Sequence, residues 1–173
     1  MIVMLYDAYL RSSLEYNALV WDPREAVQKL MLEKLHEKFC RFLFKKMYGY
    51  YPFLYPSLYV TGMVGLDTLE LRRKMTLMVH YYQLLHNKID NSTALESVSL
   101  YVPDGYMRGC MCGGVRRQRQ LLSTTHARTQ HSANSPTHRA VSLLNGLLAY
   151  APEMDIFHDG LQRFIVVVRN YLS

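Results

Sequence analysis

Apolar residues recur at helical spacing through most of the chain. Over residues 2–21 they return every three or four positions, which predicts one amphipathic helix. The stretch DPRE at 22–25 then indicates a capped helix start, and a second helix is expected over 23–48 with Gly49 as its end. Because almost no linker separates these two helices, we expect them to form a hairpin or a sharp corner.

The middle of the chain contains an aromatic connection followed by the clearest helical pattern. Residues 50–65 are rich in tyrosine, proline and glycine, and they predict an ordered connection with a short helix in it. The stretch DTLE at 67–70 is a second capping pattern, and the apolar spacing after it predicts a helix that ends near Asn87. A short helical stretch over 94–98 and an extended segment over 100–103 are expected next.

The helical pattern stops after residue 103 and restarts at residue 135. Glycine, arginine, serine, threonine and histidine dominate residues 104–134, which predicts a long irregular segment, partly disordered, with Leu121 and Leu122 among its few apolar anchors. The pair Ser135-Pro136 starts a further helix. A last helix is expected after Pro152, although the β-branched run at 165–168 would also suit a strand.

These patterns predict a mainly α fold in three parts. The parts are a small helical bundle over 1–103, a long irregular basic segment over 104–134 and a C-terminal helix pair over 135–173. A length of 173 residues suits one domain with an insert. No apolar run approaches the roughly 20 residues that cross a bilayer, and the N-terminal stretch lacks the basic start of a signal peptide. We therefore expect an intracellular protein without a membrane partner.

The net charge of +6 is concentrated in the irregular segment. Between Pro103 and Arg139 six arginines stand against a single acid, Asp104. Such a field attracts polyanions, nucleic acid first among them, and a solvated basic loop without a fixed partner is the alternative. Consecutive basic residues also open the helix after residue 67, where at least one should face solvent. The candidate nucleic-acid-binding residues are Arg72, Arg73, Lys74, Arg108, Arg116, Arg117, Arg119, Arg128 and Arg139.

The sequence contains no motif of a familiar catalytic site. A phosphate-binding glycine loop, a nucleophile elbow and a pair of adjacent aspartates for two metal ions are all missing from it. Cys110, Cys112, His126 and His131 would supply four zinc-compatible ligands, but one residue separates the cysteines where structural sites have about two to four. Unpaired thiols are the favoured interpretation. We predict no catalytic residue, no metal, no cofactor and no small-molecule substrate.

Tyrosine is frequent, with 14 residues in the chain. Five of them gather near prolines, at Tyr48, Tyr50, Tyr51, Tyr55 and Tyr59. Such a cluster could stack on unpaired bases. The favoured interpretation is a connection whose rings seal it against a helical core.

Three stretches in the first half stand in a recognisable order: LRSSLEYNALVWDP at 10–23, LEKLHEKFCRFL at 32–43 and GLDTLELRR at 65–73. They resemble the stretches "LVRSxLEYxxxVWxP", "LExVQxKFxRFL" and "LGLxxLexRR" that follow the polymerase core in jockey-like insect non-LTR retrotransposon reverse transcriptases. Shorter matches continue to the end of the chain and resemble the family's "IDxxxLL", "xxVP" and "RTxxxxxSPxxRxxxxxN…DIF". They are KID at 88–90, LYVP at 100–103, RT at 128–129, NSP at 134–136, Arg139, Asn145 and DIF at 155–157.

The resemblance covers nearly the whole chain. It implies the end of the polymerase thumb and a helical C-terminal extension, which hold the RNA template and the primer strand while the palm synthesises DNA. The palm and endonuclease motifs are not in the sequence, so the chain is not expected to polymerise alone, and its start at Met1 suits a truncated copy or a partial gene. The stretch CMCGGVRRQR at 110–119 matches nothing in the family.

Three functions follow from these observations. The leading expectation is a non-catalytic piece of an RNA-directed DNA polymerase that helps to hold template RNA and primer DNA. The first alternative is a decayed or repurposed helical protein-interaction module. The second is a remnant that folds poorly because the palm against which its apolar faces packed is missing, and exposed apolar helix faces would mark it.

Overall fold

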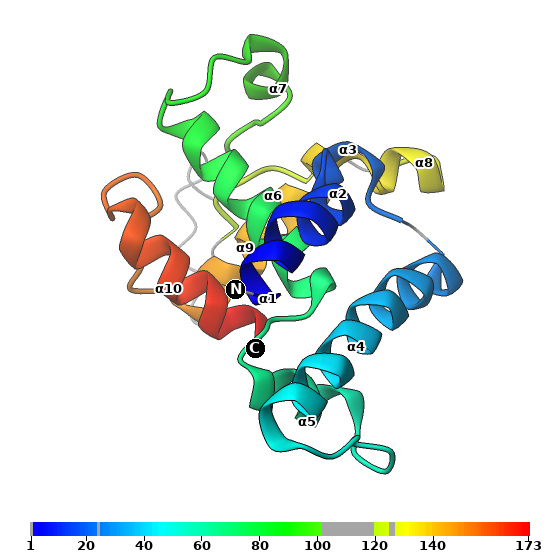
Figure 1. Ribbon diagram of the computed structural model, residues 1–173. Helices are drawn as coiled ribbons and strands as arrows, with labels where there is room; N and C mark the ends of the chain where they lie inside the picture. Colours follow the sequence, from blue (N-terminus) through cyan, green and yellow to red (C-terminus); the bar gives the residue numbers. More distant parts are fainter. Residues whose placement is uncertain (1, 24, 102–119, 125–126) are drawn as a thin grey trace, which may run out of the picture. The chain divides into compact units, whose positions relative to one another are not determined.

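The computed structural model describes residues 2–23, 25–101, 120–124 and 127–173, and these residues are mainly helical (Figure 1). The expected fold class is therefore confirmed. Contacts between Cα atoms divide the chain into two units, Met1–Thr76 and Leu77–Ser173. The division falls inside one long helix and not at the basic segment, where sequence composition had suggested a boundary.

The first stretch of unit 1 is not the single helix expected over residues 2–21. It runs through α1 (Ile2–Leu5), a π-helical turn η1 (Tyr6–Arg11) and α2 (Ser12–Glu15), and restarts as α3 (Ala18–Trp21). Asn17 lies between the last two with φ +52°. A right-handed helix cannot continue through a left-handed residue, and asparagine tolerates that conformation better than most side chains do.

Helix α4 (Ala26–Tyr48) is the longest element of unit 1. The expected start at residue 23 is wrong, because the backbone is still extended at Glu25. Asp22, the first residue of the DPRE stretch, instead accepts a hydrogen bond from Arg73. The expected end is confirmed. Gly49 takes φ +81°, and its N–H donates to the Lys45 carbonyl at 2.9 Å.

Helix α5 (Ser57–Val64) confirms the short helix expected in the tyrosine-rich connection. It lies beside the C-terminal part of α4 (Figure 1). The two helices share a small core of Cys40, Phe44 and Val60, each 1% exposed. We refer to α4, α5 and the residues between them as the α4–α5 hairpin.

Helix α6 (Leu69–Leu85) runs from unit 1 into unit 2. The Thr68 hydroxyl accepts from the Leu71 N–H at 3.3 Å, so a side chain caps the helix near the expected place, but the capping residue is Thr68 and not the first residue of the DTLE pattern. The helix ends close to the expected place, with Asn87 at φ +54° after it. Helix α7 (Ser92–Glu96) then begins two residues earlier than expected, because the Asn91 side chain caps it.

Unit 2 continues with α8 (Gln130–Ala133), α9 (Pro136–Tyr150) and α10 (Leu161–Leu172). The short α8 lies within a segment expected to be irregular to residue 134. Helix α9 begins as expected, with the Ser135 hydroxyl accepting from the His138 N–H at 3.3 Å. Helix α10 begins after Gly160 and not directly after Pro152, and the strand alternative for residues 165–168 is wrong because they lie within this helix.

The core of unit 2 forms where α6, α9 and α10 contribute fully buried side chains. The Tyr82 and Phe164 rings stack with centroids 4.4 Å apart, and the Tyr82 hydroxyl donates to the Asp159 carbonyl at 2.6 Å. The Tyr82 ring is thus packed against another ring and its hydroxyl has a hydrogen-bond partner, as a buried tyrosine usually requires. The other fully buried large apolar side chains of this unit are Met78, Leu84, Leu122, Leu144, Leu147 and Ile156.

The residues before and after the arginine-rich stretch, which contains Arg108, Arg116, Arg117 and Arg119, are bonded to one another within unit 2. Leu100 and Leu122 form an antiparallel bridge, and the Tyr101 N–H donates to the Leu121 carbonyl at 2.9 Å. The Asn145 side chain binds the Leu122 backbone twice, donating to its carbonyl at 2.9 Å and accepting from its N–H at 3.1 Å. The anchor expected from Leu121 and Leu122 is therefore confirmed.

Candidate nucleic-acid-binding surface

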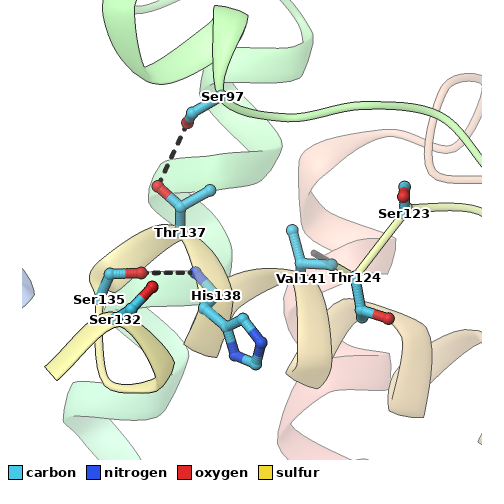
Figure 2. A pocket seen from close by; sticks show the side chains of 8 residues that line it. All are labelled: Ser97, Ser123, Thr124, Ser132, Ser135, Thr137, His138 and Val141. Atoms are coloured by element: carbon cyan, nitrogen blue, oxygen red, sulfur yellow. Dashed lines mark hydrogen bonds between the residues drawn. The ribbon is translucent and has the colours of Figure 1, made fainter. Parts of the chain in front are cut away.

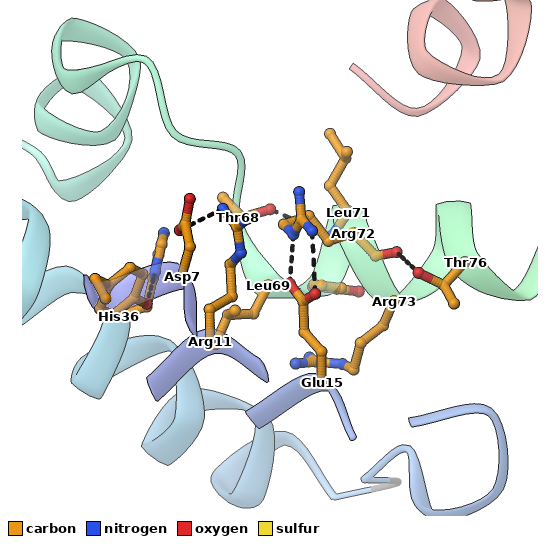
Figure 3. Close-up of polar contacts among 12 residues, drawn as sticks. Asp7, Arg11, Glu15, His36, Thr68, Leu69, Leu71, Arg72, Arg73 and Thr76 are labelled. Atoms are coloured by element: carbon orange, nitrogen blue, oxygen red, sulfur yellow. Dashed lines mark hydrogen bonds and ion pairs between the residues drawn. The ribbon is translucent and has the colours of Figure 1, made fainter. Parts of the chain in front are cut away.

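A network of carboxylates and guanidinium groups connects three separate stretches of unit 1, and Figure 3 shows the pair of Glu15 and Arg72 within it. Glu15 of α2 accepts two hydrogen bonds from Arg72 of α6, with Arg72 Nη2 at 3.0 Å from Glu15 Oε2 and Nε bonded to the other oxygen. A bidentate pair of this kind fixes the geometry of both side chains. The hydrogen bond to Glu15 also raises the pKa of Arg72, so the guanidinium stays charged.

Arg73 and Glu33 form the buried part of the same network. The Arg73 side chain is 3% exposed, and its Nε donates to Asp22 Oδ1 at 2.9 Å, while its Nη2 lies 3.9 Å from Glu33 Oε1. Glu33 of α4 in turn accepts from the N–H groups of Leu69 at 3.3 Å and Glu70 at 2.7 Å. A carboxylate from α4 therefore satisfies the first free N–H groups of α6 and complements the positive end of that helix.

This network changes the interpretation of the three consecutive basic residues. Arg73 is buried and ion-paired, so it does not stand where a phosphate could meet it. Arg72 is held by Glu15 with 31% of its side chain exposed. Lys74 is the residue that faces solvent, with 43% of its side chain exposed and a bond of 2.9 Å to Glu70. Arg72 and Arg73 therefore stabilise unit 1 through ion pairs within it.

The remaining predicted binding residues are divided between described and undescribed parts of the chain. Arg128 is exposed and Arg139 is half-buried in α9, and both belong to unit 2. The others lie outside the described residues: Arg108, Arg116, Arg117 and Arg119.

A polar cavity of about 190 Å³ lies at the N-terminal end of α9 (Figure 2). Thr137 Oγ1 lies 2.8 Å from the Tyr81 hydroxyl and 3.3 Å from the Ser97 hydroxyl, and Ser135 caps the helix. Figure 2 shows the His138 imidazole directed away from Ser135, so these two side chains form no nucleophile–base pair. Its lining is Ser97, Ser123, Thr124, Ser132, Ser135, Thr137, His138 and Val141.

A buried polar trio in unit 1 escaped the sequence interpretation. The Tyr6 hydroxyl lies 2.5 Å from His36 Nδ1, and His36 Nε2 lies 3.5 Å from Cys40 Sγ. Burial raises the pKa of Tyr6 to about 12 and of Cys40 to about 11, and it lowers the pKa of His36. All three are neutral near pH 7, so Cys40 is not an activated nucleophile. The spacing of His36 and Cys40 by one helical turn was the available signal.

The α4–α5 hairpin carries the most exposed apolar surface of unit 1. The rings of Tyr48, Tyr50 and Tyr55 surround the buried Phe44 with centroid distances of 4.4, 5.4 and 6.3 Å. These tyrosines nevertheless keep 41–50% of their area exposed, and Phe53 keeps 84%. The expected sealing of the connection thus holds for the inner faces of the rings, while their outer faces remain in solvent.

The sequence interpretation also missed the positive charge of this hairpin from Lys38 onwards, after its two acids, Glu33 and Glu37. Residues 38–66 contain four basic side chains and no aspartate or glutamate. Arg41 is used internally, donating to the carbonyls of Pro52 and, at 3.1 Å, Tyr55. The other three are exposed: Lys38, Lys45 and Lys46. The signal was the absence of acids, which the denser arginines after residue 103 concealed.

No cluster of three or more metal-ligating side chains occurs in the part of the chain that the structure describes. Of the four zinc-compatible residues, only His131 is described, and it is exposed in α8. Cys110, Cys112 and His126 lie outside the described residues. None of the described helices is both long enough and apolar enough to span a bilayer.

Comparisons with models of protein families, with curated protein sequences and with solved structures gave no significant match.

Proposed function

We propose that this chain is the non-catalytic C-terminal region of an RNA-directed DNA polymerase of the jockey-like non-LTR retrotransposon type, and that it helps to hold template RNA and primer DNA. The observation that carries this proposal is the network in unit 1. Glu15 of the first matching stretch pairs with Arg72 of the third. Glu33 of the second caps the helix that the third begins.

The network supports the proposal because it connects stretches that match the family separately. Short matches that arose independently would have no reason to contain charges that pair with one another across more than 50 residues of sequence. Here the side chains that pair across the matching stretches are Glu15 with Arg72, and Asp22 and Glu33 with Arg73. A fold shared with the family would produce such pairs together with the order of the stretches along the chain.

The distribution of charge supports a nucleic-acid partner. The chain carries a net charge of +6, and its two acid-poor regions are residues 38–66 and residues 105–139. Both regions offer cations to a phosphate backbone, which provides most of the affinity in non-specific nucleic-acid binding. A role in holding the template and primer requires affinity of this kind and no catalytic group.

The experiment that tests the holding role compares nucleic acids of one length and different form. One is an RNA template annealed to a shorter DNA primer, and the other is a blunt-ended DNA duplex of the same length as the template. We expect the purified chain to bind the first more tightly than the second. Primer extension by the chain alone should give no product. Equal affinity for both forms would reduce the proposal to non-specific attraction of polyanions.

A protein-interaction module is the second candidate, and one observation favours it. The first half of α4 exposes an apolar stripe at helical spacing, with Val27, Leu30, Met31 and Leu35 exposed by 58, 57, 64 and 46%. An exposed apolar stripe of this kind is typical of a surface that packs against another protein, and it is also the feature expected of a remnant that lacks its palm, so stable folding of the chain is what separates these two alternatives. A chain that is folded and binds no nucleic acid at low salt would leave this candidate as the better account.

A further inference from the structure

We propose that the outer surface of the α4–α5 hairpin binds single-stranded nucleic acid, with its aromatic rings stacked on unpaired bases and its lysines placed against the backbone phosphates. This inference rests on the proposed nucleic-acid role and names the surface that performs it. The aromatic side chains concerned are Tyr48, Tyr50, Tyr51, Phe53, Tyr55 and Tyr59.

Each of these rings contacts at least one neighbouring ring. Tyr55 and Tyr59 stack with centroids 5.4 Å apart and planes inclined by 17°, and Tyr51 meets Phe53 at 5.1 Å. Tyr50 stands edge-on against the buried Phe44 at 81°. Rings that already have a fixed orientation lose little conformational entropy when a base stacks on them, so they favour binding more than free rings would.

The backbone beneath the rings is fixed as well. Gly49 turns the chain at the end of α4 through a left-handed conformation. The Arg41 guanidinium then holds the connection from inside, through hydrogen bonds to the carbonyls of Pro52 and Tyr55, and lies 3.5 Å from the Ser57 hydroxyl. An arginine that is used in this way explains how a tyrosine-rich connection with exposed rings keeps one shape.

Charge selects nucleic acid as the occupant of this surface. Lys38, Lys45 and Lys46 are exposed on the same hairpin, and from residue 38 onwards it contains no acid that would repel a phosphate, since its two acids, Glu33 and Glu37, both come before that residue. Aromatic rings beside a basic groove are the usual means by which proteins bind single strands without reading their sequence. A duplex hides the faces of its bases, so the stacking part of the interaction is specific for single strands.

The test measures fluorescence anisotropy of labelled 15-nucleotide single-stranded RNA and of a duplex of equal length, with the full chain and its variants. We expect the double variant Tyr51→Ala/Phe53→Ala to bind the single strand about tenfold more weakly, because a base–ring stack contributes roughly a factor of 10 or more. Its affinity for the duplex should not change. The double variant Lys45→Ala/Lys46→Ala should lower the salt slope by about 1.4, at about 0.7 per single-strand phosphate.

The matched control is Leu54→Ala/Leu58→Ala, which removes exposed apolar side chains of the same hairpin that have no ring, 96 and 75% exposed. We expect this variant to bind like the unmodified chain, and circular dichroism should show that every variant is folded. Equal losses from the ring and leucine variants would overturn stacking.

Two further outcomes separate this inference from the function on which it rests. If the ring variant binds RNA normally while the unmodified chain does bind RNA, the hairpin is not the site and the proposed function stands. If the unmodified chain binds no RNA, both fail together. Vesicles of anionic phospholipid form the last arm, and loss of vesicle binding by the ring variant without loss of RNA binding would assign the surface to membranes and overturn the inference.

Discussion

At the scale of single residues, Glu33 shows how one side chain serves two elements. It belongs to α4, yet it accepts from the first N–H groups of α6 and lies beside the buried Arg73. Local sequence predicts a side-chain cap at the start of α6, because a cap is only three residues from its partner, although the capping residue is Thr68 and not Asp67. It does not predict Glu33, since that contact depends on how two distant helices meet.

Replacing Glu33 should therefore destabilise unit 1. We expect Glu33→Gln to lower the free energy of unfolding by about 2 kcal/mol, because it removes charge from a helix N-terminus and leaves Arg73 buried with less compensation. Urea unfolding measured at pH 7 gives this value. The control is Glu25→Gln, at an exposed glutamate that caps nothing through its side chain, and an equal loss there would contradict the role given to Glu33.

The pair Glu15–Arg72 makes a separate prediction about charge. We expect Glu15→Arg and Arg72→Glu each to lower the free energy of unfolding by about 1 kcal/mol, a modest value because both groups are partly solvated. The double variant restores opposite charges and should recover part of the loss. A double-mutant cycle measures the coupling, and losses that simply add would show that the two side chains do not interact.

His36 predicts a pH dependence with a definite sign. Burial lowers the pKa of His36 in the folded state below the unfolded value of about 6.5, so the unfolded chain binds the proton more readily. The free energy of unfolding should therefore fall as pH decreases below about 6.5. Because carboxylates titrate nearby in pH, the difference between the unmodified chain and His36→Gln is the quantity to measure. A difference that is constant from pH 7 to 5 would contradict this prediction.

At the scale of elements, the helices that carry local start and stop signals were predicted well. Helix α9 begins at the Ser135-Pro136 signal and α4 ends at Gly49, and each signal acts through its nearest backbone. The break at Asn17 was missed because the apolar spacing continues through it. The late start of α10 was missed because residues 153–160 fold back onto the core through Met154 and Ile156, which are buried, and this burial is a tertiary effect.

Two glycines of the α4–α5 hairpin give a matched test of helix termination. Gly49 has φ +81° with nothing near its Cα that a methyl group would meet, so Gly49→Ala should destabilise the fold by about 1 kcal/mol through backbone strain alone. Gly62 lies inside α5, also with open space around it, so Gly62→Ala should stabilise the fold by about 0.5–1 kcal/mol. Thermal unfolding distinguishes the two, and a shift of the same sign in both would refute this account of Gly49.

At the scale of the whole molecule, sequence and structure agree on class and differ on where the candidate surface lies. Three consecutive basic residues pointed to Arg72, Arg73 and Lys74, but pairing with acids elsewhere in the chain uses two of these side chains internally. A sequence does not reveal which cations are paired. For the α4–α5 hairpin, the sequence showed only that tyrosines are frequent. It did not show which rings are exposed, since that depends on how α5 packs on α4.

The arginine-rich stretch makes a prediction that charge alone supports. We expect Arg116→Ala/Arg117→Ala/Arg119→Ala to weaken binding to RNA and to lower the salt slope by about 2, at about 0.7 for each lost phosphate contact. Anisotropy measured at several salt concentrations tests it. Unchanged affinity at low salt would remove this stretch from the binding surface without affecting the ring variants.

The measurement that tests the central claim most directly is binding of the unmodified chain to a short structured RNA across a salt series. A chain that holds template and primer should bind at low salt and lose affinity with a log–log slope of several units, since each phosphate contributes roughly 0.7 to 0.9. Circular dichroism of the same sample establishes that it is folded. A folded chain that binds no RNA at low salt would contradict the account and favour a protein-interaction module.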